Sequence, residues 1–393
     1  MAYLASALAI VIWTYLLIGR DAYWRASEEL PPAYPPKVWP DVSAIIPARD
    51  EVETIGAVVK AHAATTYPGK FTISIVNDAS SDATADEVLR AAQQSGRQIE
   101  LLNAPPLPDG WKGKMNAVAT GIQYVHNKQP TTTSQENTNK YFLLTDADIV
   151  MGPETLMRLV AHAVSNDIAL TSLMARLDSR GLWGGLLIPA FVYFFQQLYP
   201  FPASNNPKSR TAAAAGGCML VNANALAKAG GIEAIKGALI DDCALAHLIK
   251  NGNPRRVIWL GLAKNDEAIS LRDNRSLSSI WTMVSRSAFA QLNHSWALLA
   301  LSILGMFLIY LAPPALVVFG VLNDQTVLAA IAGGATLLMA LSYFPTIRSF
   351  DQHPIFSFAL PIAAFFYLLM TISSGLNHAR GKGGAWKGRT YQH

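Results

Sequence analysis

The chain has 393 residues, enough for one soluble domain of about 250 residues and further elements. Only 15% of its residues are charged and its mean hydropathy is +0.23, which is low in charge for a soluble enzyme. The net charge is only +4 and no run of Lys or Arg occurs, which argues against a nucleic-acid partner. Cys218 and Cys243 have neither C-x-x-C nor metal-site spacing, so we expect a cytosolic domain with free thiols.

The first hydrophobic segment lies at the N-terminus. Residues 2–19 contain no charge and are followed by Arg20, Asp21 and Arg25, and this length matches about one bilayer crossing. A cleaved signal peptide is the alternative, but no basic region precedes the segment and no A-x-A site closes it. We therefore expect residues 1–20 to be an uncleaved transmembrane anchor.

The middle of the chain alternates between short apolar runs and segments with helical spacing. The expected strands and helices, in chain order, are strand 42–47, helix 54–64, strand 71–76, helix 82–94, strand 99–102, helix 114–126 and strand 141–144. This alternation predicts an α/β fold with a doubly wound, mostly parallel sheet. Ligands of such sheets bind beyond the carboxyl ends of the strands.

Polar or charged clusters follow all four expected strands, at 49–51, 77–82 and 110–114, and at the pair Asp146 and Asp148. Asp and Ser are also good helix caps, and Asp82 in particular has that simpler interpretation. Four clusters at one sheet edge are harder to explain by capping alone. No G-x-G-x-x-G follows the first strand and no G-x-x-x-x-G-K-[ST] occurs, which argues against dinucleotide-binding Rossmann enzymes and P-loop proteins.

The D-x-D triplet of Asp146 and Asp148 is the most informative of these clusters. Two carboxylates that are two residues apart, where a strand passes into a loop, can bind one divalent cation. Carboxylate oxygens suit Mg²⁺ or Mn²⁺, and Mg²⁺ usually lies between carboxylates and phosphates. A second acidic pair, Asp241 and Asp242, precedes an expected helix at 243–250, where helix capping is the alternative.

The last third of the chain is again apolar, with long segments at 296–322, 326–343 and 354–374. Each is long enough to span a bilayer, and a buried soluble bundle is the alternative. The pair Pro313-Pro314 would kink or break the first segment, so we expect it to be the one that does not cross. The basic tail holds Arg380, Lys382, Lys387 and Arg389 and suits an anionic cytoplasmic leaflet.

Two further apolar stretches mix aromatic and polar residues. Residues 183–201 include several prolines and are too broken for a span, and residues 280–292 lead into the first C-terminal segment. Both resemble interfacial helices that could deliver a lipid, although core helices are the alternative. The expected division is an anchor at 1–20, a cytosolic domain at 40–275, an interfacial helix at 276–295, a transmembrane region of about three segments at 296–376 and a basic tail at 377–393.

Several stretches together resemble family 2 glycosyltransferases, which have the nucleotide-diphospho-sugar transferase (GT-A) fold. The matching stretches are IIPARDE, IVNDASSDAT, the helix start at Gly113-Lys114, LLTDADI, GGCMLVNANAL and LIDDCALA, within about residues 42–290. The membrane layout is similar to that of ceramide glucosyltransferases. The sequence most resembles bacterial hopene-associated glycosyltransferases of hopanoid gene clusters.

The resemblance implies roles for residues on the donor side. Asp50 and Asp78 would contact the uracil and ribose of a UDP-sugar, and Lys114 would lie near its diphosphate. Asp146 would contact ribose or the metal, and Asp148 would hold Mn²⁺ or Mg²⁺ against both phosphates.

The resemblance also implies roles on the acceptor side. Gly216, Gly217 and Cys218 would line the sugar and acceptor side together with Asp241. Asp242 would be the general base, deprotonating an acceptor hydroxyl as its oxygen attacks the anomeric carbon. One such displacement inverts the configuration of the sugar.

One motif of the family departs from its usual form. Where the family often has Q-x-x-R-W, this chain has residues 283–287, in which Arg286 is kept but the Gln and Trp are not. In processive polysaccharide synthases that Trp helps to position the polymer. The departure argues against a polymer synthase and leaves Arg286 as a candidate phosphate contact, with an exposed helical Arg as the alternative.

The resemblance, together with the apolar segments, therefore implies an inverting glycosyltransferase of the hexosyltransferase type in the bacterial inner membrane. The protein would be multi-pass, with its catalytic domain cytoplasmic, and would use a nucleotide-sugar donor and a lipid hydroxyl acceptor of hopanoid or related lipid biosynthesis. A processive synthase and a non-catalytic membrane scaffold of the same fold are the alternatives. Both Asp148 and Asp242, whose loss would favour a scaffold, are present.

Overall fold

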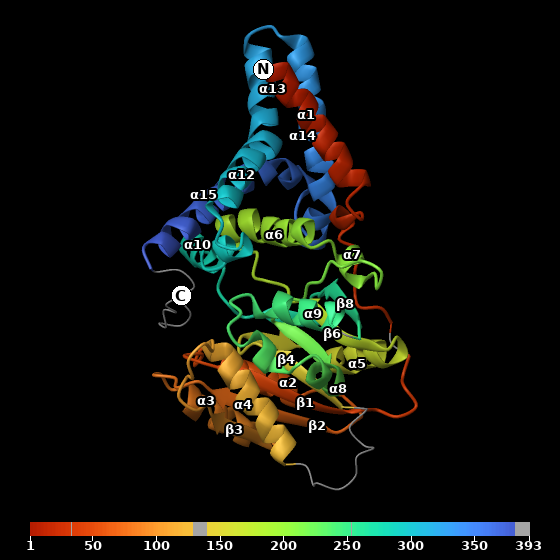
Figure 1. Cartoon of the computed structure of the whole chain (residues 1–393), viewed down its shortest axis with the longest axis vertical. Helices are drawn as coiled ribbons and strands as arrows, with labels where there is room; N and C mark the ends of the chain where they lie inside the picture. Colours follow the sequence, from red (N-terminus) through yellow and green to blue (C-terminus); the bar gives the residue numbers. More distant parts are fainter. Residues whose placement is uncertain (33, 129–139, 253, 382–393) are drawn as a thin grey trace. The chain divides into compact units, whose positions relative to one another are not determined.

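The computed structural model describes residues 1–32, 34–128, 140–252 and 254–381 (Figure 1). Lys382, Lys387 and Arg389, which belong to the predicted basic cytoplasmic tail, lie outside the described residues.

The chain divides into two compact units. The α/β unit comprises residues 28–177 and 203–272, and the helical unit comprises residues 1–27, 178–202 and 273–393. The expected domain at 40–275 is thus interrupted by residues 178–202, which pack with the other apolar helices.

The α/β unit alternates strands and helices over most of its length, as predicted. Its strands are β1 Asp41–Ala48, β2 Phe71–Asn77, β3 Ile99–Asn103, β4 Lys140–Thr145, β5 Ile149–Met151, β6 Ile168–Met174, β7 Cys218–Asn222, β8 Val257–Leu262 and β9 Ala268–Ser270. Its helices are α2 Ile55–Ala63, α3 Thr84–Ser95, α4 Gly113–Asn127, α5 Thr155–Ser165, α8 Ala223–Lys228, the short η3 Ile232–Ile235 and α9 Asp241–Asn251, while α7 Phe201–Asn205 bridges the boundary.

The seven-stranded sheet has the order β3-β2-β1-β4-β7-β6-β8, and β5 pairs with β9 in a separate two-stranded sheet. Strands β3, β2, β1 and β4 are parallel, whereas β7 is antiparallel to both β4 and β6. The parallel half places the carboxyl ends of β1, β2 and β4 at one edge. This arrangement confirms the predicted mostly parallel α/β fold.

Strand β1 shows why the sheet is covered on both faces. All its residues after Asp41 are buried, which is typical of a strand between two layers of helices. Ala44 and Ile46 belong to a core formed with α2, α3 and α5, whereas Ile45 belongs to a second core formed with α4, α8 and α9. Alternate side chains of one strand therefore serve two cores.

The helical unit consists almost entirely of apolar helices. They are α1 Ala2–Ile18, η1 Tyr23–Arg25, α6 Gly181–Leu198, α10 Leu277–Ser285, α11 Ala288–Gln291, α12 Trp296–Met306, the π-helical η4 Phe307–Leu311, α13 Ala312–Leu322, α14 Thr326–Ser349, η5 Pro354–Ala359 and α15 Leu360–Ala379. By length and composition, four helical stretches of the described chain could cross a membrane, at 181–198, 296–322, 326–349 and 354–379. Helix α1, with 17 residues, is shorter but similarly apolar.

The double proline, for which the sequence predicts a kink or a break, does not break the first C-terminal segment. Pro313 and Pro314 have no N–H, so the carbonyl of Ile309 loses the partner that a regular helix would supply four residues later. The indole Nε1 of Trp13 donates to that carbonyl at 3.0 Å, and one π-helical turn carries the chain into α13. A side chain of α1 thus replaces the missing backbone donor, and 27 residues remain helical.

Two other expectations about apolar segments need correction. The stretch that we expected to be too broken for a span forms the continuous helix α6, with Pro189 inside it. The expected single helix at 276–295 is instead the two short helices α10 and α11. Within the helical unit, α1, α13 and α14 pack side by side (Figure 1). Helix α6 packs against α14, α10, α15 and η1, and α15 packs mainly against α10, α11, α12 and η4.

Candidate functional site at the carboxyl edge of the sheet

The loops after β1 and β2 are joined by the polar residues that the sequence singled out. The Asp50 carboxylate accepts hydrogen bonds from the backbone N–H and the hydroxyl of Ser81, at 2.7 and 3.1 Å. Arg49 donates to the backbone carbonyls of Asp78 and Ala79, at 2.6 and 2.9 Å. Asp50 and Ala79 both adopt left-handed backbone conformations (φ 51° for each), which Asp tolerates better than most residues. The two loops therefore form one cross-linked surface.

Asp78 occupies a more enclosed position than the sequence suggested. Its side chain is only 2% exposed, and its backbone N–H donates to the carbonyl of Ala48 at 2.8 Å. Asp82, by contrast, accepts the backbone N–H groups of Thr84, at the start of α3, and of Val52, although the N-cap of α3 is Ala83 and not Asp82 as its capping interpretation predicted. Contact of Asp78 with a nucleotide remains a prediction.

Lys114, in the first turn of α4, joins the two acidic pairs. Its Nζ lies 2.8 Å from Oδ1 of Asp146 and 3.1 Å from Oδ2 of Asp241. Burial alone would lower the pKa of Lys114, but the negative charges of Asp146, Asp241 and Asp242 outweigh it and raise the pKa above its ordinary value. A fully charged ammonium group therefore lies between the D-x-D motif and the start of α9.

Asp242 is held in place by the backbone rather than serving as a helix cap. Its Oδ2 accepts the N–H of Gly216 at 2.8 Å and its Oδ1 accepts the N–H of Cys243 at 2.7 Å. The N-cap of α9 is Ile240, and both Asp241 and Asp242 lie in the first helical turn. Burial and the charge of Asp241 raise the pKa of Asp242 to about 6, against the opposing effect of Lys114. A carboxylate with this pKa is suited to accept a proton near neutral pH.

The glycines before β7 allow these groups to approach closely. A Cβ atom added to Gly216 would lie 3.3 Å from both Oδ2 of Asp242 and Nζ of Lys114, and one on Gly217 would lie 3.2 Å from Ile149. Cys218 was expected on the sugar and acceptor side, but its side chain is fully buried in the core of the sheet. Only the backbone of Cys218 remains a candidate for contact with a ligand.

Asp148 has two partners that the sequence analysis missed. Its Oδ2 accepts the hydroxyl of Ser270 at 2.7 Å and lies 3.6 Å from Nε of Arg272. Arg272 also lies 3.9 Å from a carboxylate oxygen of Glu51, in the loop after β1. Ser270 and Arg272 lie at and just after the end of β9, so the search for polar residues that follow strands could have identified them. However, β9 is only three residues long and pairs with the equally short β5, so no periodic signal marks it.

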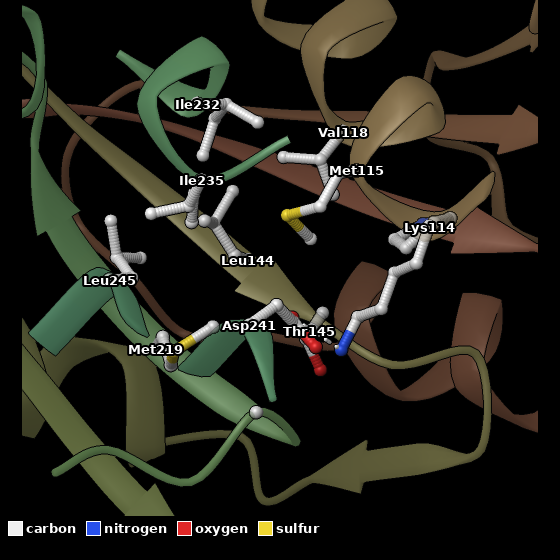
Figure 2. Close-up of a pocket in the computed structure, with 12 residues that line it drawn as sticks. Lys114, Met115, Val118, Leu144, Thr145, Met219, Ile232, Ile235, Asp241 and Leu245 are labelled. Carbon is white, nitrogen blue, oxygen red and sulfur yellow. Dashed lines mark ion pairs between the residues drawn. The ribbon is translucent and has the colours of Figure 1, made fainter. Parts of the chain in front are cut away.

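A narrow cavity lies beside Lys114 and Asp241 (Figure 2). Its walls are apolar side chains of α4, β4, β7, η3 and α9, namely Met115, Val118, Leu144, Met219, Ile232, Ile235 and Leu245. Its volume is about 10 Å³, space for about one water molecule. A sugar cannot enter a cavity of this size, so it is not itself the binding site of a nucleotide-sugar.

The residues fit a divalent cation only if a ligand supplies part of its coordination shell. Asp146 and Asp148 offer hard carboxylate oxygens two residues apart, which suit Mn²⁺ or Mg²⁺. Within the described parts of the chain, no group of three or more His, Cys, Asp and Glu residues is arranged to hold a metal. This set therefore suits a cation shared with phosphates rather than one enclosed by protein ligands alone.

Arg286 belongs to the helical unit, where it is the C-cap of α10. Its backbone N–H donates to the carbonyl of Thr282 at 3.2 Å. The proposed contact of Arg286 with phosphate stays a prediction.

Comparison with known proteins agrees with this description. Residues 43–230 match the family described as glycosyl transferase family 2. The structure is similar to a mannosyltransferase from Pyrobaculum calidifontis in complex with GDP-Man and Mn²⁺, with a TM-score of 0.51, 17% identity and coverage of 93% of this chain and 99% of that chain. It is also similar to glucosyl-3-phosphoglycerate synthase from Mycobacterium tuberculosis in complex with Mn²⁺ and UDP-glucose, with a TM-score of 0.37, 17% identity and coverage of 64% and 79%. No curated protein sequence matches the chain significantly. The fold is GT-A.

Proposed function

We propose that this chain, whose residues 43–230 match the glycosyl transferase family 2 model, transfers a sugar from a nucleotide-sugar to a lipid hydroxyl in a membrane. The observation that carries the proposal is the arrangement around Lys114. This cation contacts Asp146 of the D-x-D motif and Asp241, and both Lys114 and Asp242 lie against Gly216. Charge for binding a diphosphate and a base for deprotonating an acceptor are thus within one small region.

The chemistry that we assign to these side chains is a single displacement. An acceptor hydroxyl oxygen attacks the anomeric carbon, the bond from that carbon to the phosphate oxygen breaks, and the nucleoside diphosphate leaves with the electron pair. Asp242 accepts the hydroxyl proton, and Lys114 offsets negative charge on the diphosphate. A divalent cation held by Asp146 and Asp148 would act as a Lewis acid toward the phosphates. The sugar product would have inverted configuration.

The lipid acceptor is supported by the apolar helices rather than by the site. Among the described residues, four helical stretches could cross a membrane by length and composition, and α1 is a shorter apolar helix. We propose that the protein is multi-pass in the bacterial inner membrane, with the α/β unit in the cytoplasm, where nucleotide-sugars are made. A hopanoid or related lipid is the acceptor that we favour, and this choice rests on the resemblance to hopene-associated glycosyltransferases.

Two alternatives remain for the same fold. A processive polysaccharide synthase is disfavoured because residues 283–287 lack the Gln and Trp of the Q-x-x-R-W motif. A scaffold without activity is disfavoured because the carboxylates of both Asp148 and Asp242, whose loss would favour it, are present. The donor base is also open to test, because the mannosyltransferase with a similar structure is bound to GDP-Man.

The proposal is tested by incubating membranes that contain the protein with radiolabelled UDP- and GDP-sugars and extracted bacterial lipids. We expect label from one nucleotide-sugar to enter a single lipid product in the presence of Mn²⁺ or Mg²⁺. Membranes containing the Asp242→Asn variant are the matched control and should give no product. Ladders of products of increasing length would instead indicate a processive synthase. Absence of label from every lipid with all donors would favour a scaffold.

A further inference from the structure

Arg272 is a cation at the D-x-D motif that the family resemblance does not assign. Its guanidinium lies 3.6 Å from Oδ2 of Asp148 and 3.9 Å from Oε1 of Glu51. The Asp148 side chain is 8% exposed, whereas that of Arg272 is 41% exposed. A partly exposed arginine is therefore paired with a buried carboxylate.

The two ion pairs of Arg272 are loose. Both distances exceed the 2.7–2.9 Å of a charge-assisted hydrogen bond, and the same Asp148 oxygen already accepts the Ser270 hydroxyl at 2.7 Å. Arg158, by comparison, contacts Glu267 at 2.6 Å, as expected for an arginine that fixes the fold. Arg272 thus neutralises charge without being locked in one position, and it can exchange partners at small cost.

We propose that Arg272 is a positioning residue that pairs with Asp148 in the donor-free protein and turns to the donor diphosphate when the nucleotide-sugar binds. This inference rests on the proposed function. A cation that binds to Asp148 repels the guanidinium, and a diphosphate is a bidentate partner that suits an arginine. Arg272 would therefore oppose metal binding in the empty site and favour nucleotide binding in the occupied one.

This dual role predicts two effects of opposite sign for Arg272→Gln. Loss of a charge-assisted contact should weaken the binding of UDP, or of GDP if that is the donor base, by about 10- to 100-fold at saturating Mn²⁺. Loss of a positive charge beside Asp148 should strengthen Mn²⁺ binding to the nucleotide-free protein by about 3- to 10-fold. A variant that was merely less well folded would bind both ligands more weakly.

The experiment uses the full chain in detergent. Mn²⁺ binding is followed by the loss of the electron paramagnetic resonance signal of free Mn²⁺, and nucleotide binding by isothermal titration calorimetry. Arg272→Lys keeps the charge and should retain the Mn²⁺ affinity of the wild type while recovering part of the nucleotide affinity. Arg90→Gln is the matched control, because Arg90 is a similarly exposed arginine paired with Glu87 on α3, and it should change neither affinity.

The outcomes separate this inference from the proposed function. If the wild type binds neither UDP nor GDP with Mn²⁺, the proposed function fails. If it binds one of them and Arg272→Gln binds Mn²⁺ and that nucleotide as the wild type does, only the role of Arg272 is overturned. Weaker binding of both ligands by Arg272→Gln would also overturn that role, because it indicates a structural residue.

Discussion

Replacing Asp242 by Asn should abolish sugar transfer while leaving donor binding nearly unchanged. The substitution keeps the shape of the side chain but removes its ability to accept a proton. Loss of a positioned general base typically slows a reaction by about 10²–10⁴-fold, which corresponds to about 3–5 kcal/mol of transition-state stabilisation. The base is needed for proton removal and not for donor affinity, so the nucleotide Kd should change little.

The dependence of the rate on pH provides a second signature. Because the pKa of Asp242 is raised from 3.8 to about 6, the carboxylate becomes available as pH rises through 6. The wild-type kcat/KM, which reports the pKa of the donor-free protein, should therefore increase about tenfold between pH 4 and 5 and level off above about pH 7. The residual rate of Asp242→Asn should not show this rise with pH.

The same pKa predicts how the substitution affects stability. The pKa of Asp242 is higher in the folded state (about 6) than in the unfolded state (3.8), so protonation of this carboxyl favours the folded state. This stabilisation is complete below pH 3.8 and is lost as pH rises through about 6. At pH 8 the burial of the Asp242 charge thus costs at most about 3 kcal/mol, which Asn removes. Asn cannot accept from both Gly216 and Cys243, however, and one lost acceptor costs about 1–3 kcal/mol. The Tm of the variant relative to wild type should therefore improve from pH 5 to pH 8.

The assay measures transfer of labelled sugar to lipid, nucleotide binding by calorimetry, and Tm by circular dichroism. Asp241→Asn is the matched control, since Asp241 has the adjacent position but pairs with Lys114. Near-normal turnover by Asp242→Asn together with an inactive Asp241→Asn would show that the general base is Asp241 and that our assignment is wrong.

Three further predictions follow from the site and the helices. Asp148→Ala should abolish Mn²⁺- or Mg²⁺-dependent transfer without unfolding the protein, and full activity of this variant in excess EDTA would exclude the metal role. Lys114→Met removes the charge that lowers the pKa of Asp242, so the rising limb of the pH–rate profile should move to higher pH; an unmoved limb would show that the two groups are not coupled. Reporter fusions after Lys37 and at His393 should both indicate the cytoplasm. We expect α12–α13 to cross the membrane outward and α14 to cross it back, whereas α15, which packs against α10 to α12 and little against α14, would not cross. A periplasmic signal after Lys37 would overturn the cytosolic donor, whereas one at His393 alone would indicate three full C-terminal crossings.

The parallel part of the fold could be predicted because its signals are local. The strand at 41–48 is a continuous apolar run that ends where its polar loop begins, and the same holds for the strand before Asp146. Parallel strands place their carboxyl ends at one edge by geometry alone, so the clusters at Asp50 and Asp146 could be assigned to one region without coordinates. Apolar segments long enough to cross a bilayer are equally local features.

The contacts that define the site depend on residues far apart in the sequence. Asp148 is partnered by Ser270 and Arg272, more than 120 residues later, through a two-stranded sheet too short to leave a pattern. The position of Asp242 is set by the N–H of Gly216, and its pKa is set by burial, which only tertiary packing determines.

The double proline shows the same division between local and tertiary information. The sequence by itself determined that Pro313 removes a backbone donor, and from that a break was the reasonable expectation. Only the tertiary structure supplied the indole of Trp13 to the carbonyl of Ile309 and kept the helix continuous. Sequence patterns reveal which groups lack a partner within their own element. Which distant side chain becomes that partner is decided by the packing of elements that are not neighbours in the chain.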